Sequence, residues 1–208
     1  MAGTAPDVSA LLVVDVQPDF MPGGALAVAG GDEVVEPIAE WMSSGRFGHV
    51  VATQDWHPAG HASFATRHGR QHFDVIDLHG HEQVMWPDHC VQGSAGAELH
   101  AGLPLDRVDM VLRKGTRPDV DSYSGFSENW NAAGERVPTG LGGWLRERGV
   151  THVAVCGLAR DVCVKWTAQD AVTSGFETTF LWELTRSVDP AGDDALRRDL
   201  EAGGVNIL

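Results

Sequence analysis

The chain has few basic residues and no long apolar stretch. Its 208 residues include 15 Lys and Arg against 29 Asp and Glu, which gives a formal net charge of −14. Nucleic-acid binding relies on clustered positive charge, so this balance argues against a nucleic-acid partner and, for the same reason, against an anionic membrane surface. The longest purely apolar run near the N-terminus covers only residues 10–14, far too few to span a membrane.

The chain also has few cysteines, and its N-terminus does not resemble a secretory leader. The odd number of cysteines (Cys90, Cys156 and Cys163) leaves at least one thiol unpaired, and a chain of this length can bury its own core without disulfides. The first basic residue is Arg46, so the N-terminus lacks the positive region of a secretory leader. We therefore expect a cytoplasmic protein in a reducing compartment.

The balance of 43% hydrophobic and 21% charged residues predicts one globular domain over residues 1–208. Several apolar segments are hydrophobic at consecutive positions, which is typical of parallel strands buried on both faces. They alternate with amphipathic segments, so we expect an α/β fold with a doubly wound, Rossmann-like parallel sheet of about six strands and helices on both faces. The expected strands are 10–16, 48–53, 108–112, 151–156, 177–182 and 205–208, and the expected helices are 32–44, 139–148, 161–174 and 190–202.

The helix limits are predicted from capping residues. Asp32, Thr139 and Asp161 are expected N-caps, and Gly149 and Gly175 are expected to end the helices that precede them. The span 55–107 is rich in His, Gly and Pro and shows little strand or helix signal. Connections of that length are usually functional, so this span is expected to carry a binding region.

Four polar residues of different chemistry fall at the ends of expected strands or just beyond them. Asp15 lies near the end of the first apolar segment, Asp55 and Lys114 follow the second and third, and Cys163 begins a helix after the fourth. Ligands of open α/β sheets bind beyond the carboxyl ends of the strands, so these groups can converge on one site.

Each of these groups also has a purely structural interpretation, which the residues alone leave open. Asp15 could cap backbone amides, Lys114 could be a solvated edge residue, and Cys163 could be a small buried hydrophobic residue. That last interpretation fits Cys90 and Cys156 better than it fits Cys163. A buried Asp15 would still need a partner, which Lys114 can supply. The helix dipole and a nearby ammonium would lower the pKa of Cys163, so acid, lysine and thiol form a coherent nucleophilic set.

Nine of the ten histidines lie between residues 49 and 100. Asp55 and His57 are two residues apart, so in an extended chain both side chains face the same way. A third ligand from His61 or His89 would complete the mixed carboxylate and imidazole set that suits zinc, iron or manganese. The glycine-rich stretch 140–143 follows no strand and lacks the spacing of a dinucleotide-binding motif, and no phosphate-binding P-loop is present.

Five segments in order resemble the isochorismatase-like cysteine hydrolase superfamily, and most of all its nicotinamidase (pyrazinamidase) branch. The resemblance covers nearly the whole chain, and the ordered combination is far more specific than any one segment. The segments are LLVVDVQPDF at 11–20, ATQDWHPAGHASF at 52–64, WPDHCVQGSAGAEL at 86–99, LRKGTRPDVDSYSGF at 112–126 and VAVCGLARDVCVKWTAQDA at 153–171.

The resemblance implies a catalytic set. The family's catalytic acid falls on Asp15, its lysine on Lys114 and its nucleophile on Cys163. It also implies a cis peptide bond between Leu158 and Ala159, with the backbone N–H groups of Ala159 and Cys163 as the oxyanion hole.

The resemblance further implies one divalent metal ion, zinc first, with iron or manganese as alternatives. His61 matches a position that is a ligand in only some relatives, and Pro18 departs from the Asn often found there, at a turn position that tolerates proline. The family's metal ligands fall on Asp55, His57 and His89, and its substrate-binding aromatic residues fall on Phe20, Trp86 and, near them, Tyr123.

The activity implied by the resemblance is the hydrolysis of nicotinamide to nicotinic acid and ammonia through a cysteine thioester, in cytoplasmic NAD salvage. The expected partners are small molecules, nicotinamide and pyrazinamide, rather than nucleic acid or membrane, and a homo-oligomer is compatible with this interpretation. One alternative is a superfamily hydrolase that acts on isochorismate, ureidoacrylate or N-carbamoylsarcosine. Another is a non-catalytic binding protein, against which the presence of all three catalytic residues argues.

Overall fold

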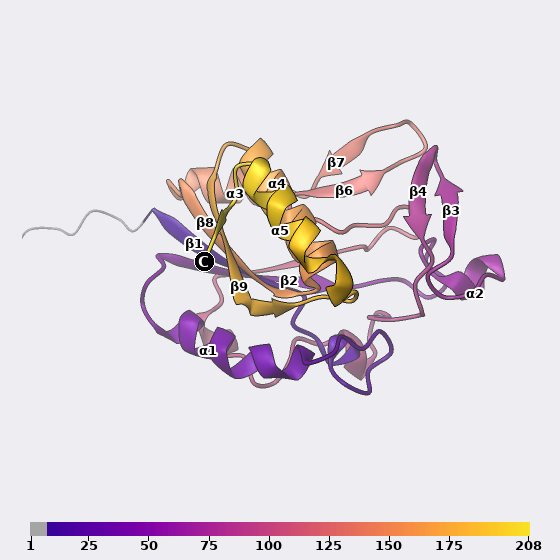
Figure 1. The fold of residues 1–208 in the computed structure, drawn as a ribbon, viewed down its shortest axis with the longest axis horizontal. Helices are drawn as coiled ribbons and strands as arrows, with labels where there is room; N and C mark the ends of the chain where they lie inside the picture. The colour runs from indigo at the N-terminus through magenta and orange to yellow at the C-terminus, as the bar shows by residue number, and fades with distance from the viewer. Residues whose placement is uncertain (1–7) are drawn as a thin grey trace, which may run out of the picture.

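The fold is built on a central sheet of six parallel strands, seen in a computed structural model that describes residues 8–208 (Figure 1). Residues 1–7 of the expected domain lie outside the described residues. Every segment expected to be a strand contributes to this sheet, so the predicted α/β fold is confirmed. In spatial order the strands are β10 (Asn206–Ile207), β9 (Glu177–Arg186), β8 (His152–Leu158), β1 (Ser9–Val14), β2 (His49–Asp55) and β5 (Met110–Lys114).

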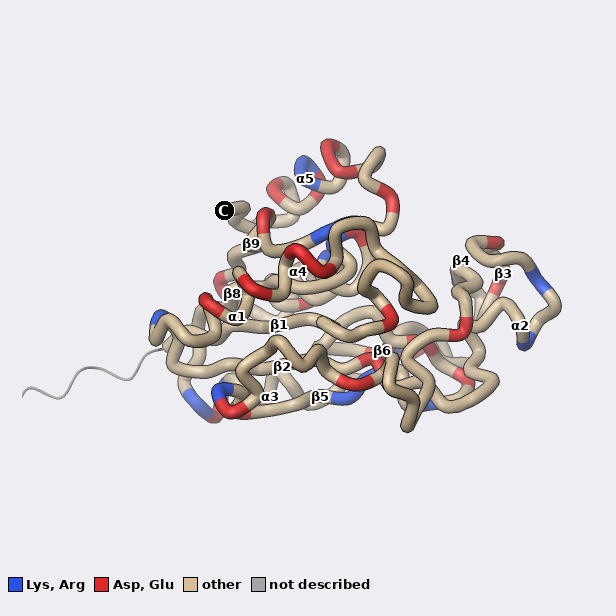
Figure 2. Tube along the Cα trace, turned by 90° about the horizontal axis from the view of Figure 1, so that it is seen from below, with Lys and Arg blue, Asp and Glu red and all other residues tan. Residues whose placement is uncertain are grey.

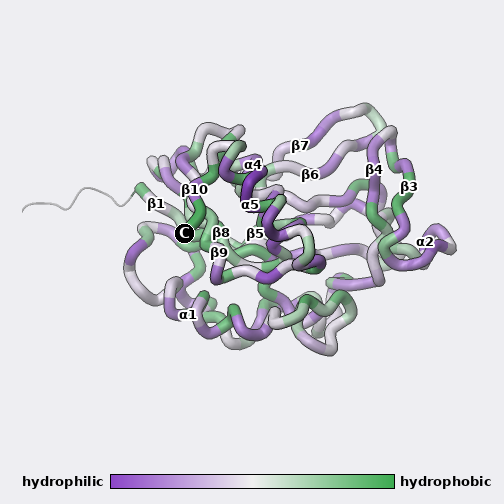
Figure 3. Tube along the Cα trace, viewed as in Figure 1, coloured by the Kyte–Doolittle hydropathy of each residue, from purple (hydrophilic) through white to green (hydrophobic). Residues whose placement is uncertain are grey.

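The central strands are buried on both faces, as their unbroken apolar runs predict. Successive residues of a strand point to opposite faces, so β1 divides its side chains between two cores. Leu11 and Val13 pack into one hydrophobic cluster, and Ala10, Leu12 and Val14 pack into the other. Figure 3 shows hydrophobic positions concentrated along these strands.

Helices cover both faces of the sheet (Figure 1). On one face, α1 (Val35–Ser43) packs its buried side chains into the cluster that holds Leu11. On the other face lie α3 (Leu141–Glu147), α4 (Lys165–Thr173) and α5 (Asp193–Ala202). The chain runs outward from β1 to β2 and β5 on one side and to β8 and β9 on the other, so the strand order reverses beside β1. This reversal is where a doubly wound sheet leaves its ligand crevice.

The predicted N-caps are wrong, whereas the predicted helix ends are confirmed. Asp32 lies inside a 3-10 helix that precedes α1, and α3 begins after Gly140 rather than Thr139. The carboxylate of Asp161 accepts hydrogen bonds from the backbone N–H groups of residues 188 and 189, away from its own helix. Gly149 and Gly175 have left-handed backbones just beyond α3 and α4, as expected of helix-ending glycines.

The long span 55–107 contains secondary structure that the sequence did not predict. It includes the short helix α2 (Ala65–His68) and an antiparallel hairpin of β3 (Val75–Leu78) and β4 (His81–Val84). A second hairpin, β6 (Ser127–Trp130) with β7 (Arg136–Pro138), follows β5. Both hairpins lie at the end of the molecule toward which β2 points in Figure 1, so they flank the carboxyl ends of the parallel strands.

The acidic excess is distributed over the molecule. Figure 2 shows Asp and Glu along helices and loops on several sides, with the fewer Lys and Arg between them. Within residues 8–208, no helix is both long and apolar enough to cross a membrane.

Candidate active site

The four polar residues expected at strand ends meet at the carboxyl edge of the sheet. Asp15 directly follows β1, Asp55 ends β2, Lys114 ends β5, and Cys163 lies in a π-helical turn after β8. These strands are neighbours in the sheet and all run in the same direction, so their carboxyl ends share one edge. The topology therefore brings together side chains that are about 150 residues apart in sequence.

Lys114 lies at the centre of this group and is buried. Its Nζ is 2.8 Å from Asp15 Oδ2, 2.9 Å from Asp55 Oδ1 and 3.5 Å from Cys163 Sγ. Although burial opposes it, the two carboxylates raise the pKa of Lys114 well above its usual value. The side chain is therefore a fixed positive charge inside the site, and its interpretation as a solvated edge residue is excluded.

Asp15 offers a carboxylate oxygen that can receive a proton. Its Oδ1 accepts a 2.6 Å hydrogen bond from the Thr53 hydroxyl. Its Oδ2 lies 2.8 Å from the Lys114 ammonium, and the Cys163 thiol also hydrogen-bonds to this carboxylate. Burial raises the pKa of Asp15, against the lowering effect of Lys114, so this carboxylate is a stronger base than an exposed aspartate.

Cys163 differs from the prediction in its protonation. Burial raises the pKa of the Cys163 thiol well above its usual value; the Lys114 ammonium lowers it, and the Asp15 and Asp55 carboxylates raise it further. Lys114 lowers the pKa of the thiol as expected, but desolvation at this buried position outweighs that effect, so the pKa is raised overall. In this arrangement the thiol is protonated at neutral pH and needs a base when it attacks.

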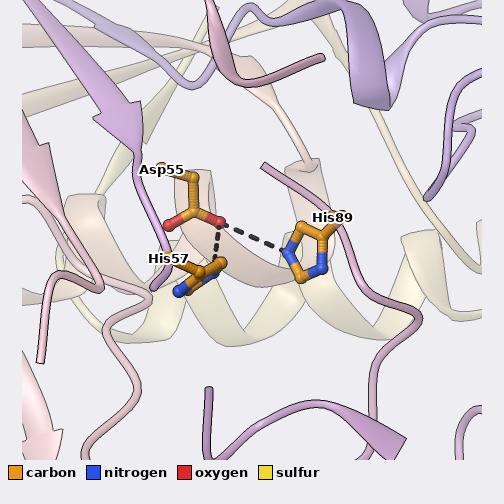
Figure 4. A group of neighbouring side chains, drawn as sticks. All are labelled: Asp55, His57 and His89. Atoms are coloured by element: carbon orange, nitrogen blue, oxygen red, sulfur yellow. Dashed lines mark hydrogen bonds and ion pairs between the residues drawn. The ribbon is translucent and has the colours of Figure 1, made fainter. Parts of the chain in front are cut away.

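Asp55, His57 and His89 present three metal-type ligand atoms to one point (Figure 4). The Nδ1 atoms of His57 and His89 lie 3.0 and 2.7 Å from the carbonyl oxygens of Gly115 and Pro87, so each Nδ1 carries the donated proton. The two Nε2 lone pairs then face Asp55 Oδ2, at 3.1 and 3.4 Å. Two imidazole nitrogens and a carboxylate oxygen that converge on one point are a mixed donor set that suits a divalent metal ion, so the three residues fit such an ion.

The same argument separates His61 from this group. Its Nε2 lies 3.1 Å from the carbonyl oxygen of Val120 and must donate to it, while its Nδ1 lies 2.8 Å from the Ser63 hydroxyl. Both ring nitrogens of His61 are therefore in use, although a ligand atom of His61 lies within 4.8 Å of ligand atoms of His57 and Asp121. Burial and the neighbouring His57 lower the pKa of His61 to about 4, so the ring is neutral.

The residues expected to bind substrate line one cavity. Phe20, Trp86 and Tyr123 border it together with Cys163 and Ala159, and the peptide bond between Leu158 and Ala159 is cis, as the resemblance implies. Asp55, His57 and His89 line the same cavity. A planar ring held between these aromatic side chains would therefore lie near the thiol and near the three metal-type ligands.

Gln17 supports the site and was missed by the sequence analysis. It is fully buried, its amide nitrogen donates a 2.9 Å hydrogen bond to the Asp55 carbonyl, and its amide oxygen accepts one of 2.8 Å from the Asp55 N–H. The side chain thus holds the backbone of Asp55 from both sides. A polar residue two positions after Asp15, directly after the first apolar segment, was the available signal.

Gly115 was also missed. It follows Lys114 in a left-handed conformation with φ of 62°, and a Cβ atom there would overlap Cε1 of His57. Only glycine allows the backbone to pass this close to the imidazole while its carbonyl oxygen accepts the His57 Nδ1 proton.

Comparisons with known proteins agree with this site. The isochorismatase domain family matches residues 9–208. The chain is 46% identical to the nicotinamidase of Acinetobacter baylyi, over 88% of this chain and 83% of that protein. It is 43% identical to the nicotinamidase of Escherichia coli K12, over 95% and 93%.

Solved structures extend the agreement to the fold. A nicotinamidase/pyrazinamidase structure from Acinetobacter baumannii superposes with a TM-score of 0.91 at 42% identity, covering 99% of this chain and 97% of that one. A structure from L. infantum in complex with nicotinate has a TM-score of 0.85 at 43% identity, with 99% and 94% covered. A Pyrococcus horikoshii pyrazinamidase in complex with zinc has a TM-score of 0.77 at 36% identity, with 97% and 98% covered. On the family match, the identities and the superposed fold, this chain belongs to the isochorismatase domain family.

Proposed function

We propose that this protein hydrolyses nicotinamide to nicotinic acid and ammonia, the hydrolytic step of NAD salvage, and that it also accepts pyrazinamide. The observation that carries the proposal is the buried group of Asp15, Lys114 and Cys163 beside Asp55, His57 and His89, in a cavity lined by aromatic rings. Relatives at 43–46% identity are nicotinamidases, and the L. infantum relative binds the product nicotinate.

In the proposed mechanism Cys163 is the nucleophile and Asp15 the general base. The Asp15 carboxylate takes the thiol proton as sulfur attacks the carboxamide carbon, and the same proton passes to the amide nitrogen as the C–N bond breaks. Ammonia leaves and a thioester remains on Cys163. Asp15 then accepts a proton from water as water attacks the thioester, and it returns that proton to the departing thiolate, which releases nicotinic acid.

Lys114 has an electrostatic role in this proposal. Its ammonium faces both Asp15 and Cys163, so it stabilises the thiolate that forms while sulfur attacks. Because one positive charge serves both groups, their titrations are coupled rather than independent. The backbone N–H groups of Ala159 and Cys163 are the proposed donors to the oxyanion of each tetrahedral intermediate.

Asp55, His57 and His89 would hold one divalent ion, with zinc proposed first and iron or manganese as alternatives. When bound, such an ion supplies an electrophilic coordination position for a ring nitrogen of the substrate. Phe20, Trp86 and Tyr123 are proposed to hold the substrate ring. The three cysteines are all unpaired and buried, which fits the reducing cytoplasm that we propose as the location.

Product analysis tests the proposed function. Purified protein supplied with zinc is incubated with nicotinamide, and ammonia and nicotinic acid are quantified. We expect equimolar products from the wild type and no turnover by Cys163→Ala. The proposal is overturned if the wild type releases no ammonia from nicotinamide but turns over isochorismate, ureidoacrylate or N-carbamoylsarcosine, or if Cys163→Ala retains activity.

A further inference from the structure

Gln83 is a buried amide in an otherwise exposed or half-buried hairpin. Of the eight residues in β3 and β4 it is the only buried one, with 3% of its surface exposed. Burying an amide is unfavourable unless its polar atoms find partners. An apolar residue could be buried at this position at lower cost, so the inward-pointing amide must be compensated by hydrogen bonds.

The amide nitrogen of Gln83 has three acceptors in reach. It lies 2.9 Å from the Tyr123 hydroxyl, 2.8 Å from Asp121 Oδ2 and 2.9 Å from the carbonyl oxygen of Val84. Its two protons are shared among these three oxygens. The Tyr123 hydroxyl also accepts a 3.1 Å hydrogen bond from the indole N–H of Trp86. Two donors from one short stretch of chain thus fix the position of the Tyr123 hydroxyl.

The hydrogen bonds join two rings that border the candidate active site. Trp86 and Tyr123 lie edge to face, with centroids 6.3 Å apart and an interplanar angle of 86°, and both line the cavity that contains Cys163. Gln83 does not line that cavity. It borders a neighbouring cavity that Asp121 and Tyr123 also line, and its hydrogen bonds to these two residues connect it to the substrate site.

We propose that Gln83 is a positioning residue that fixes the Trp86–Tyr123 wall of the active site and thereby sets the fit of the substrate ring. This inference rests on the proposed function and deepens it. No contact joins Gln83 to Asp15, Lys114 or Cys163 within residues 8–208. Loss of the Gln83 donors should therefore weaken substrate binding and leave the reactivity of the thiol unchanged.

Gln83→Met tests this role, because methionine keeps the length of the side chain and removes its donors. We expect KM for nicotinamide to rise about tenfold with kcat within about threefold of the wild type, since Asp121, Tyr123 and the Val84 carbonyl all lose a donor. The matched control is Gln71→Met, the same change at an exposed glutamine of the same connection. Equal KM values for the two variants would overturn the inference, as would slower alkylation of Cys163 in Gln83→Met.

A double-mutant cycle with Tyr123→Phe shows whether Gln83 acts through the hydroxyl. Once the hydroxyl is gone, adding Gln83→Met should raise KM by no more than about threefold. A full tenfold rise in both backgrounds would mean that Gln83 acts independently of Tyr123, which contradicts the inference.

Two checks keep the result interpretable. The metal content and melting temperature of each variant are compared with those of the wild type. If Gln83→Met does not fold, Gln83→Glu is used instead, because glutamate keeps the shape of the side chain and replaces the donors by acceptors. An unchanged KM in Gln83→Glu also overturns the inference. Failure of the wild type to release ammonia would refute the proposed function and this inference with it. If the wild type turns over nicotinamide and the Gln83 variants have an unchanged KM, only the role of Gln83 is refuted.

Discussion

Lys114 is the residue on which the electrostatics of the site depends most, since two carboxylates and a thiol face one ammonium. The lysine opposes the effect of burial on the Cys163 thiol, so its removal should raise the pKa of that thiol further. At a fixed pH below the pKa, a higher pKa means a smaller thiolate fraction.

Lys114→Ala should therefore slow alkylation of Cys163 by iodoacetamide at neutral pH by about tenfold or more, a factor of ten for each unit of pKa. Peptide mapping assigns the label among the three cysteines. Lys165→Ala is the control, because Lys165 is the only other lysine of the chain. Equal alkylation rates in the two variants would refute the electrostatic role of Lys114.

Thr53 controls the basicity of Asp15 through the hydrogen bond of its hydroxyl. That bond lowers the pKa of Asp15, whose carboxylate is the form that acts as base. In Thr53→Val the pKa rises, so the base form is lost at a higher pH as the solution is acidified. The acid limb of the kcat/KM profile should move up by about one to two pH units, equivalent to about 1.5–3 kcal/mol for a bond to a charged group.

The matched control for this change is Thr173→Val, at an exposed hydroxyl of α4 that bonds to a carbonyl of its own helix. Its pH profile should match that of the wild type. An acid limb that stays in place in Thr53→Val, or moves to lower pH, would contradict the assignment of Asp15 as the base.

Sequence reasoning predicted the positions of Asp15, Lys114 and Cys163 but not their protonation. The positions follow from the rule that ligands bind at the carboxyl ends of parallel strands. The direction of the Cys163 pKa depends on how completely packing removes water, and no local pattern reports that. Gln83 was missed for a similar reason, because its partners Asp121 and Tyr123 are about 40 residues away.

At the scale of elements, the strands were predicted well and the helix starts poorly. Consecutive apolar residues mark a strand that is buried on both faces, and β1 with its neighbours has that pattern. Helices α1 and α4 begin through 3-10 and π-helical turns, so the residues expected as caps lie inside those turns. The hairpin of β3 and β4 was missed because only one of its residues is buried, which leaves no hydrophobic alternation to detect.

The turn after β5 is the element whose shape matters most to the metal ligands. Gly115→Ala would place a Cβ atom in steric overlap with the His57 ring and displace the ring. We expect zinc affinity to fall by about 10–100-fold, the range seen when groups that orient metal ligands are lost. Competition with a chelating dye measures this affinity.

Gly134→Ala is the control for backbone strain. Gly134 has a similar φ of 74°, but a Cβ atom on this residue would meet no other atom within 4 Å. This variant should lose about 1–2 kcal/mol of stability and keep the zinc affinity of the wild type. Equal zinc affinity in Gly115→Ala and Gly134→Ala would show that the turn does not position His57.

At the scale of the whole molecule, the sheet topology explains how distant segments build one site. The strand order reverses beside β1, and β1, β2, β5 and the turn after β8 each place one polar side chain at the same edge. Asp55 ends β2, whereas His57 and His89 lie in the long span 55–107 that follows this strand. A bound ion would therefore connect the sheet to that span.

Metal binding should therefore stabilise the fold. An ion that binds only the folded state at a hundredfold excess over its Kd contributes about 2.7 kcal/mol, which is roughly 5–10 °C in Tm for a chain of this size. We expect chelation to lower Tm by that amount and zinc to restore it. The Tm of His89→Ala should not change on either treatment. A wild-type Tm that changes with neither chelator nor zinc would contradict the proposed ligand set.

The central claim, that Cys163 carries the acyl group between the two halves of the reaction, is tested most directly by peptide mass analysis of protein quenched in acid during turnover of nicotinamide. The account predicts a nicotinoyl group on the peptide that contains Cys163. Turnover with the acyl group on another residue, or with the Cys163 peptide unmodified throughout, would contradict it.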